Sequence, residues 1–352
     1  MFYVDAHLDL AFIALNHKRD LRLPVSDIRL RDGQKPKAGI ATVSIPDLKA
    51  AGVGLVFATL FVEPAASPVA NDGVYLYHNA DEAHQQAMAQ FDYYHRLVDE
   101  DPSIRLIGDA IGLNELLTSW QGTDDRLLGI VPLMEGADPV REPEELEMWY
   151  ERGLRIIGPA WDDTQYAAGA WRNGRSGFTK NGYHLMEVMA ELGFILDISH
   201  LSEKASFEAL ERYEGPIIAT HSNVRALVPG QRHLSDTQIR TLAERGGMMG
   251  IVLYNRFLEA GYLKGDPKDR VTLAHVVAHI DHICQLLGTA DYVGIGSDFD
   301  GGFGAADIPL EMDTVSDLVK IADALRMRGY IETDITQIMG KNWFDILQRS
   351  FS

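Results

Sequence analysis

The chain has 352 residues, with 51 acidic side chains against 32 basic ones and a formal net charge of −19. Its 46% of apolar residues exclude a disordered protein, and its length fits one large domain or two smaller ones. The acidic balance argues against nucleic acid and anionic membranes as main partners, because both would repel the chain. The single cysteine, Cys284, excludes an internal disulfide framework.

The two ends of the chain carry no targeting or membrane signal that we can identify. The first residues, MFYVDAHLDL, contain neither a basic stretch nor a long apolar run, so we expect no secretory signal. The last residues, NWFDILQRSFS, lack the hydrophobic tail of a lipid-anchor signal. No stretch reaches the roughly 18 apolar residues of a membrane span. We therefore expect a cytoplasmic protein without a membrane partner.

Short apolar runs alternate with amphipathic stretches along the chain. The runs are continuously apolar, which is typical of parallel strands buried on both faces, and strands that alternate with helices indicate right-handed βαβ units. The predicted strands are Tyr3–Leu10, Gly54–Val62, Leu127–Glu135, Leu154–Trp161, Phe194–Leu201, Pro216–Ser222, Met248–Tyr254 and Tyr292–Asp298. The predicted helices are Asn79–Asp99, Asn181–Leu192, Glu203–Tyr213, Ser235–Arg245, Leu273–Leu287 and Asp313–Arg328.

Eight such strands favour an α/β fold: a (β/α)8 barrel of TIM type with loop insertions, forming one domain over residues 1–352. A doubly wound open sheet is the alternative, but no GxGxxG turn follows the first strand. Gly33–Pro46 and Asp162–Gly177 are predicted insertions. A loop as long as the second is usually functional or disordered.

Ionisable residues stand at or near the C-terminal ends of the predicted strands. In a (β/α)8 barrel these ends converge on one face, where active sites lie. Five strands would bring three imidazoles and three carboxylates to one cavity, and this set of nitrogen and oxygen ligands suits zinc or a similar divalent metal. The six residues are His7, Asp9, Glu135, His200, His221 and Asp298.

The spacing of these residues predicts two neighbouring metal ions. His7 and Asp9 are two apart on a strand, so both side chains point to the same side and can chelate one ion. His200 and His221 lie on neighbouring strands and can share a second ion, while Glu135 can offer one oxygen to each. Two ions about 3.5–4 Å apart can hold a hydroxide between them that acts as the nucleophile.

Asp298 would remain as a general base or acid that takes the water proton and passes it to a leaving amine. Each motif also has an ordinary structural explanation when it is taken singly. Buried histidines often bond to a backbone carbonyl, and the Asp residues of SDFDGG favour turns. All the motifs occur at the same end of the strands, however, and ionisable groups in apolar surroundings are costly unless they are paired or metal-bound. The joint pattern therefore favours the metal site.

Several sequence segments together resemble the membrane dipeptidase (renal dipeptidase) family of the amidohydrolase superfamily. The chain looks like a soluble, bacterial-type member of that family, and the resemblance covers residues 5 to about 347. In chain order the segments are DAHLDL, LMEGAD, DISHLS, ATHSNVRAL, GIGSDFDGG and GKNWFDIL.

The resemblance implies two Zn²⁺ ions as cofactors, with other divalent metals as an alternative. Asp298 and Glu135 would be the catalytic residues, with Asp298 as the acid or base and Glu135 bridging the two ions. The ligands implied for the first ion are His7, Asp9 and Glu135, and those for the second are Glu135, His200 and His221.

The resemblance also implies residues that bind the substrate. Arg232 falls where the family uses an arginine to hold the C-terminal carboxylate of the substrate, a role that suits the paired donors of a guanidinium. Tyr254 aligns with a tyrosine that lines the family's pocket. Trp161 stands where better-known members have a histidine near the scissile bond, and His233 stands where the family usually has asparagine. These two departures bear on the choice of substrate more than on the type of reaction.

The resemblance thus implies a binuclear zinc dipeptidase whose partner is a small dipeptide, L,D-dipeptides included. Dimerisation is common in the family, and the expectation of a homodimer rests on that alone. A first alternative is a related metallo-amidohydrolase that acts on N-acyl amino acids or cyclic amides, motivated by Trp161 and the loop Asp162–Gly177. A catalytically idle binding barrel is disfavoured by the intact ligand set. A phosphate-binding barrel without metal is disfavoured because the loops after the last two strands are not basic.

Overall fold

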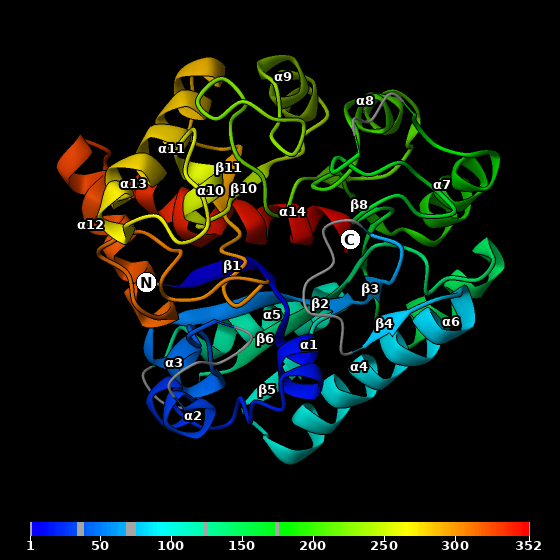
Figure 1. Cartoon of the computed structure of the whole chain (residues 1–352), viewed down its shortest axis with the longest axis horizontal. Helices are drawn as coiled ribbons and strands as arrows, with labels where there is room; N and C mark the ends of the chain where they lie inside the picture. The colour runs from blue at the N-terminus through cyan, green and yellow to red at the C-terminus, as the bar shows by residue number, and fades with distance from the viewer. Residues whose placement is uncertain (1, 34–38, 68–74, 123–125, 173–175, 352) are drawn as a thin grey trace.

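The computed structural model describes residues 2–33, 39–67, 75–122, 126–172 and 176–351. Within these residues, parallel strands gather at the centre of the molecule and helices surround them (Figure 1). One sheet pairs its strands in the order β1 (Tyr3–Leu8), β2 (Val53–Phe61), β6 (Leu128–Glu135), β7 (Ile156–Gly158), β8 (Ile195–Asp197) and β9 (Ile217–Ile218).

The remaining strands of the barrel are β10 (Met249–Ile251) and β11 (Val293–Ile295), which pair with each other in parallel. A parallel bridge between Ala219 and Met249 connects β9 to β10. After β11, the amide of Asp298 donates to the carbonyl of His7 at 3.1 Å, so the last strand returns to the first. The predicted (β/α)8 barrel is therefore confirmed, and the open doubly wound sheet is wrong.

Each predicted strand overlaps an observed one, and β2 begins one residue before its predicted start, but the later strands are shorter than predicted. All residues of β1, β2 and β6 are buried, as expected of continuously apolar strands. From β7 onward the paired segments are two or three residues long. The chain leaves the ladder before Trp161, His200, His221 and Asp298, because these residues belong to the loops that shape the cavity.

The predicted helices are also present, with ends that shift by no more than one residue, except that Asp313–Arg328 divides into a 3₁₀ segment, Val315–Leu318, and α12. Asn79 caps α4, and a capping box at Ser235 begins α9. The helices are α1 (Leu10–Asn16), α2 (Val25–Asp32), α3 (Ile45–Ala50), α4 (Ala80–Glu100), α5 (Ala110–Ser119), α6 (Leu146–Glu151), α7 (Lys180–Leu192), α8 (Glu203–Arg212), α9 (Asp236–Glu244), α10 (Asn255–Leu258), α11 (Leu273–Leu287), α12 (Val319–Arg328), α13 (Glu332–Thr336) and α14 (Asn342–Ser350). Shorter elements are β3 (Glu63–Pro64), β4 (Leu76–Tyr77), β5 (Ile104–Leu106), two further 3₁₀ turns (Pro143–Glu145 and Lys268–Arg270) and a π-helical turn (Gln337–Lys341).

The C-terminal motif GKNWFDIL begins at the end of the π-helical turn and continues into α14, which closes the N-terminal end of the barrel. Trp343 is fully buried, lies 5.3 Å from the ring of Phe57, and donates its indole N–H to the carbonyl of Ile295 at 3.0 Å. The side chain of Asn342 donates to the carbonyls of Ala290 and Val293. This end of the barrel is therefore plugged, and the opposite end carries the polar side chains.

The two predicted insertions are only partly described, because residues 34–38 and 173–175 lie outside the described residues. The second insertion packs over the site: the amide of Ala170 donates to the carbonyl of His200 at 2.8 Å. In the described parts of the chain, no helix combines the length and the apolar character needed to cross a membrane. The single domain over residues 1–352 and the cytoplasmic location stay predictions.

Candidate metal and catalytic site

The C-terminal ends of five barrel strands bring the ionisable residues together, as the sequence predicted. His7 lies within β1 and Asp9 directly follows that strand, while Glu135 is the last residue of β6. His200, His221 and Asp298 each come three residues after the end of their strand, β8, β9 and β11.

Glu135 lies at the centre of this cluster. Its Oε1 is 2.9 Å from Nε2 of His200 and 3.2 Å from Nε2 of His221. Its other oxygen, Oε2, is 3.5 Å from Nε2 of His7, which in turn lies 3.9 Å from Oδ1 of Asp9. The two oxygens of one carboxylate therefore face two different groups of ligand atoms.

Both groups have the chemistry and spacing of a metal site. Donor atoms in each group lie within 4.8 Å of one another, and ligands about 2.0 Å from a tetrahedral zinc would be about 3.3 Å apart. Nε2 of His7 is buried and has no hydrogen-bond partner among the described residues, which is unusual for a buried polar atom. The residues present thus fit the two divalent ions that the sequence predicted.

A hydroxyl group behind the cluster orients two of the imidazoles. Oγ1 of Thr220 donates to Oδ2 of Asp197 at 2.5 Å and lies 3.2 Å from Nδ1 of His7 and 2.9 Å from Nδ1 of His221. Because the hydroxyl has only one proton, it must accept from both imidazoles. Each ring therefore carries a proton on Nδ1 and directs its Nε2, the atom that would bind a metal, toward the centre of the cluster.

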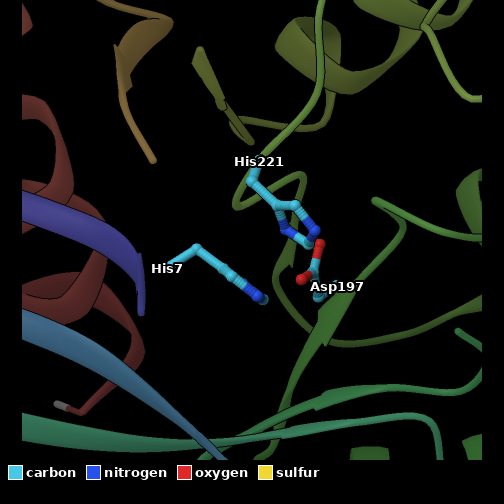
Figure 2. A group of neighbouring side chains, drawn as sticks. All are labelled: His7, Asp197 and His221. Atoms are coloured by element: carbon cyan, nitrogen blue, oxygen red, sulfur yellow. The ribbon is translucent and has the colours of Figure 1, made fainter. Parts of the chain in front are cut away.

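Figure 2 shows Asp197 beside the rings of His7 and His221. Its carboxylate is already engaged, because it also accepts from the amide and hydroxyl of Ser199 and from the amide of Thr220. Asp197 therefore supports the ligands rather than completing a third ligand group. The sequence analysis missed Asp197 and Thr220, although both occur inside the motifs DISH and ATH, next to the histidines that they position.

The charges of the cluster shift its pKa values in opposite directions. Burial disfavours a charge on His7, but Glu135, Asp298 and Asp9 outweigh burial and raise its pKa to about 10. Burial and the neighbouring Arg232 lower the pKa of His200 to about 4. The negative potential is therefore concentrated around His7, where a bound cation would be favoured.

The carboxylates respond to the same environment. Burial and the charge of Glu135 raise the pKa of Asp9 to about 6. Burial raises the pKa of Asp298 well above its usual value, and Asp9 and Glu135 add to this shift against the opposing charge of His7. Burial opposes ionisation of Glu135, but the histidines outweigh it and hold its pKa well below the usual range. Three buried carboxylates this close together repel one another, so a cation bound between them would be stabilising.

Asp298 has a left-handed backbone conformation, with φ of 60°, which is uncommon for a residue other than glycine. Its carbonyl accepts from the amide of Gly301 at 2.9 Å, which closes the turn. Asp300, also left-handed, anchors the loop by accepting from the amide and hydroxyl of Thr42 and by pairing with the buried Arg19 at 3.3 Å. The loop thus holds the Asp298 carboxylate in place at the site.

The predicted substrate-binding residues line the same cavity, which has a volume of about 280 Å³. Arg232 is buried and donates to the carbonyls of Ser199 and His221, and its Nε has no partner among the described residues. Tyr254 and Trp161 are half-buried. The cavity is lined by Asp9, Glu135, Trp161, His200, His221, Arg232, Tyr254 and Asp298, together with residues of the surrounding loops. His7 is fully buried and is absent from this lining.

The second departure from the family pattern, His233, is buried beside Phe257, with 5.0 Å between the ring centres. Burial and the charge of Arg232 lower its pKa to about 3, so it is neutral. His233 thus contributes to the packing behind the cavity, where it adds no charge.

Comparison with known proteins agrees with this geometry. The sequence profile of the membrane dipeptidase family, peptidase family M19, matches residues 1–350. The chain belongs to the membrane dipeptidase family. The predicted enzyme class, a metal-dependent dipeptidase, is thereby confirmed.

Two relatives in sequence cover 64% and 98% of the chain. An uncharacterized protein in the pqqA 5′ region of Klebsiella pneumoniae is 32% identical over 235 residues, which are 64% of this chain and 83% of that protein. Dipeptidase ataJ of Aspergillus terreus is 27% identical over 378 residues, covering 98% of this chain and 84% of its own length.

Solved structures show the same fold over the whole chain. A metallopeptidase from Rhodobacter sphaeroides, liganded with a phosphinate mimic of the dipeptide L-Ala-D-Ala, has a TM-score of 0.82 at 25% identity and 99% coverage of both chains. The probable dipeptidase PvdM from Pseudomonas aeruginosa has a TM-score of 0.80 at 20% identity, covering 100% of this chain and 96% of its own. At that identity the second likeness concerns the fold alone.

Proposed function

We propose that this member of the membrane dipeptidase family is a binuclear zinc enzyme that hydrolyses the peptide bond of dipeptides, L,D-dipeptides included. The observation that carries the proposal is the placement of Glu135, whose two oxygens face two separate groups of ligand atoms. The first group is His7, Asp9 and Glu135, and the second is Glu135, His200 and His221.

The ions, when bound, would supply Lewis acidity toward the scissile carbonyl and lower the pKa of a water molecule. The Asp298 carboxylate would accept a proton from the attacking water and pass it to the leaving amine as the C–N bond breaks and the C–O bond forms. Burial and the neighbouring carboxylates raise the pKa of Asp298, which makes its carboxylate a stronger proton acceptor.

Arg232 would hold the C-terminal carboxylate of the substrate. It is a buried cation in the cavity lining, and its Nε–H lacks a partner among the described residues. Because the C-terminal carboxylate lies one residue from the scissile bond and would pair with Arg232, substrates with an amidated C-terminus should be poor. Trp161 and Tyr254 would add apolar contact with the substrate.

The stereochemical part of the proposal is supported by the Rhodobacter sphaeroides structure, whose ligand mimics L-Ala-D-Ala. The alternative, action on N-acyl amino acids or cyclic amides, keeps the same metals and the same proton transfer. It is motivated by Trp161, whose indole offers one N–H where the family has a histidine. We also propose a homodimer, on the family resemblance alone.

The test is metal removal and restoration. Protein stripped with a chelator should lose dipeptide hydrolysis and regain it when two equivalents of Zn²⁺ are returned. A panel of L,L- and L,D-dipeptides, with matched N-acyl amino acids, should give higher kcat/KM values for the dipeptides. No hydrolysis of any dipeptide at full metal occupancy would contradict the proposal, and higher kcat/KM values for N-acyl amino acids would favour the alternative.

A further inference from the structure

Aromatic side chains line one side of the cavity above the charged cluster. The ring of Phe12 on α1 lies 5.1 Å from that of Phe61 at the end of β2, and Phe61 lies 5.1 Å from Trp161. Trp161 is 6.4 Å from Trp171, which belongs to the predicted insertion. These distances between ring centres are those of interacting aromatic pairs.

The series of neighbouring rings continues beyond Trp171. Trp171 lies 6.2 Å from Phe257 of α10, and Phe257 lies 5.1 Å from Tyr254. Tyr254 stacks on Phe303, with 4.4 Å between ring centres and 12° between their planes. We call the residues from Phe12 to Phe303 in this series the aromatic wall, and every one of them lines the same cavity.

The middle of the aromatic wall lies beside the arginine that would bind the carboxylate. The guanidinium carbon of Arg232 is 5.6 Å from the ring centre of Phe257. Nη2 of Arg232 is 3.0 Å from Nε2 of His200, whose ring lies 5.9 Å from Trp171 and 6.2 Å from Trp161. Two tryptophans and a phenylalanine therefore surround the place of the carboxylate.

Covalent geometry then places the side chain of the C-terminal residue. Its Cβ is about 2.5 Å from the carboxylate carbon, because both are bonded to the same Cα. A side chain that begins so close to the Arg232 guanidinium lies within reach of the rings of Trp171 and Phe257. Alanine would leave water against the exposed parts of these rings, whereas a benzyl or indole group would displace that water and be buried itself.

We propose that this enzyme selects dipeptides whose C-terminal residue carries a large apolar, preferably aromatic, side chain, packed against Trp161, Trp171 and Phe257. The inference rests on the proposed dipeptidase function and adds the substrate class. It concerns this chain in particular, because Trp161 stands where the family resemblance leads one to expect a histidine.

Arg256 and Lys264 also line the cavity, and their charges would suit an acidic side chain instead. Both residues are exposed, so water and salt screen their charges. The rings of Phe61, Phe257 and Phe303 are buried, and burying apolar surface against them is not screened. We therefore favour the apolar side chain over the acidic one.

The experiment compares dipeptides that differ only in the C-terminal residue. With the zinc-loaded enzyme, kcat/KM is measured for Ala-Ala, Ala-Leu, Ala-Phe, Ala-Trp and Ala-Asp, each with an L- and a D-residue at the C-terminal position, and for the reversed dipeptide Phe-Ala. We expect Ala-Phe to exceed Ala-Ala by roughly 10- to 100-fold in the preferred stereochemistry, mainly through KM. Phe-Ala should not show this gain.

Variants locate the source of the preference. Trp171→Ala should reduce the ratio of Ala-Phe to Ala-Ala to within about 3-fold, and Trp171→Phe should restore most of it. The matched control is Trp120→Ala, since Trp120 packs against Phe2 on the opposite side of the barrel and its change should leave the ratio unaltered.

The outcomes separate this inference from the proposed function. If no dipeptide is hydrolysed, the proposed function fails. If Ala-Ala and Ala-Phe have equal kcat/KM values, or if Ala-Asp or Phe-Ala is the best substrate, the function stands and the apolar C-terminal selectivity is wrong. The wild-type series alone decides this, whether or not a variant folds.

Discussion

The charged floor of the cavity and the aromatic wall above it are built in different ways. The floor consists of residues in or close to the ends of barrel strands, such as Glu135 and His221, held by neighbouring strands and by Thr220 behind them. The wall draws on segments far apart in the chain, from Phe12 to Phe303, including Trp171 of a long loop. Rigid strands suit the metal chemistry, which requires fixed positions, whereas variable loops suit substrate choice.

The largest effect should follow from removing the residue shared by both groups of ligands. In Glu135→Gln, one charged oxygen is replaced by an amide nitrogen that cannot bind a metal, so both ion sites are weakened at once. We expect kcat/KM to fall by more than about 10⁴-fold, together with the bound metal. Glu63→Gln, at a carboxylate that lines the same cavity outside the two ligand groups, is the control for metal content. Two retained ions in Glu135→Gln would contradict the bridging role.

The next effect concerns proton transfer separately from metal binding. Asp298→Asn keeps the shape of the side chain but removes its ability to accept a proton. We expect kcat to fall by roughly 10²- to 10⁴-fold while the metal content stays at the wild-type level. A fall in metal content equal to that of Glu135→Gln would show that Asp298 is a ligand rather than an acid or base.

A smaller effect should come from the hydroxyl that orients His7 and His221. Thr220→Val removes the acceptor of both Nδ1 protons and leaves Asp197 without one of its donors. We expect metal affinity to weaken by about 10- to 100-fold, measured by competition with a chromogenic chelator. Thr220→Ser keeps the hydroxyl and should bind metal nearly as well as the wild type. Equal losses of metal affinity in both variants would show that the packing of the Thr220 side chain matters, and not its hydroxyl.

The smallest effect should come from a polar group of the wall. Tyr254 stacks on Phe303 through its ring, so the wall contributes area rather than hydrogen bonds. Tyr254→Phe should lower kcat/KM by less than about 10-fold, which corresponds to the usual net free energy of one hydrogen bond. Tyr254→Ala removes the ring as well and should lower kcat/KM more. A larger loss in Tyr254→Phe would show that the tyrosine hydroxyl takes part in the reaction and does more than line the wall.

The sequence sufficed to predict the barrel and the floor, because both leave local signals. Continuous apolar runs mark buried parallel strands, and a His, Asp or Glu near the end of such a run is unusual enough to suggest a ligand. In the wall, Trp161 and Tyr254 were reached only through the family resemblance. Phe61 and Phe257 left no signal, because they are apolar residues among many and only the fold brings them to one cavity. Thr220 and Asp197 were missed because a buried threonine or aspartate near a strand end has many ordinary roles.

We propose that two metal ions share Glu135 at the floor of the barrel. Anomalous diffraction at the zinc edge, from crystals of the zinc-loaded enzyme, tests it most directly. We predict two peaks per chain, about 3.5–4 Å apart, one among His7, Asp9 and Glu135 and the other among Glu135, His200 and His221. A single peak, or peaks that do not both contact Glu135, would contradict it.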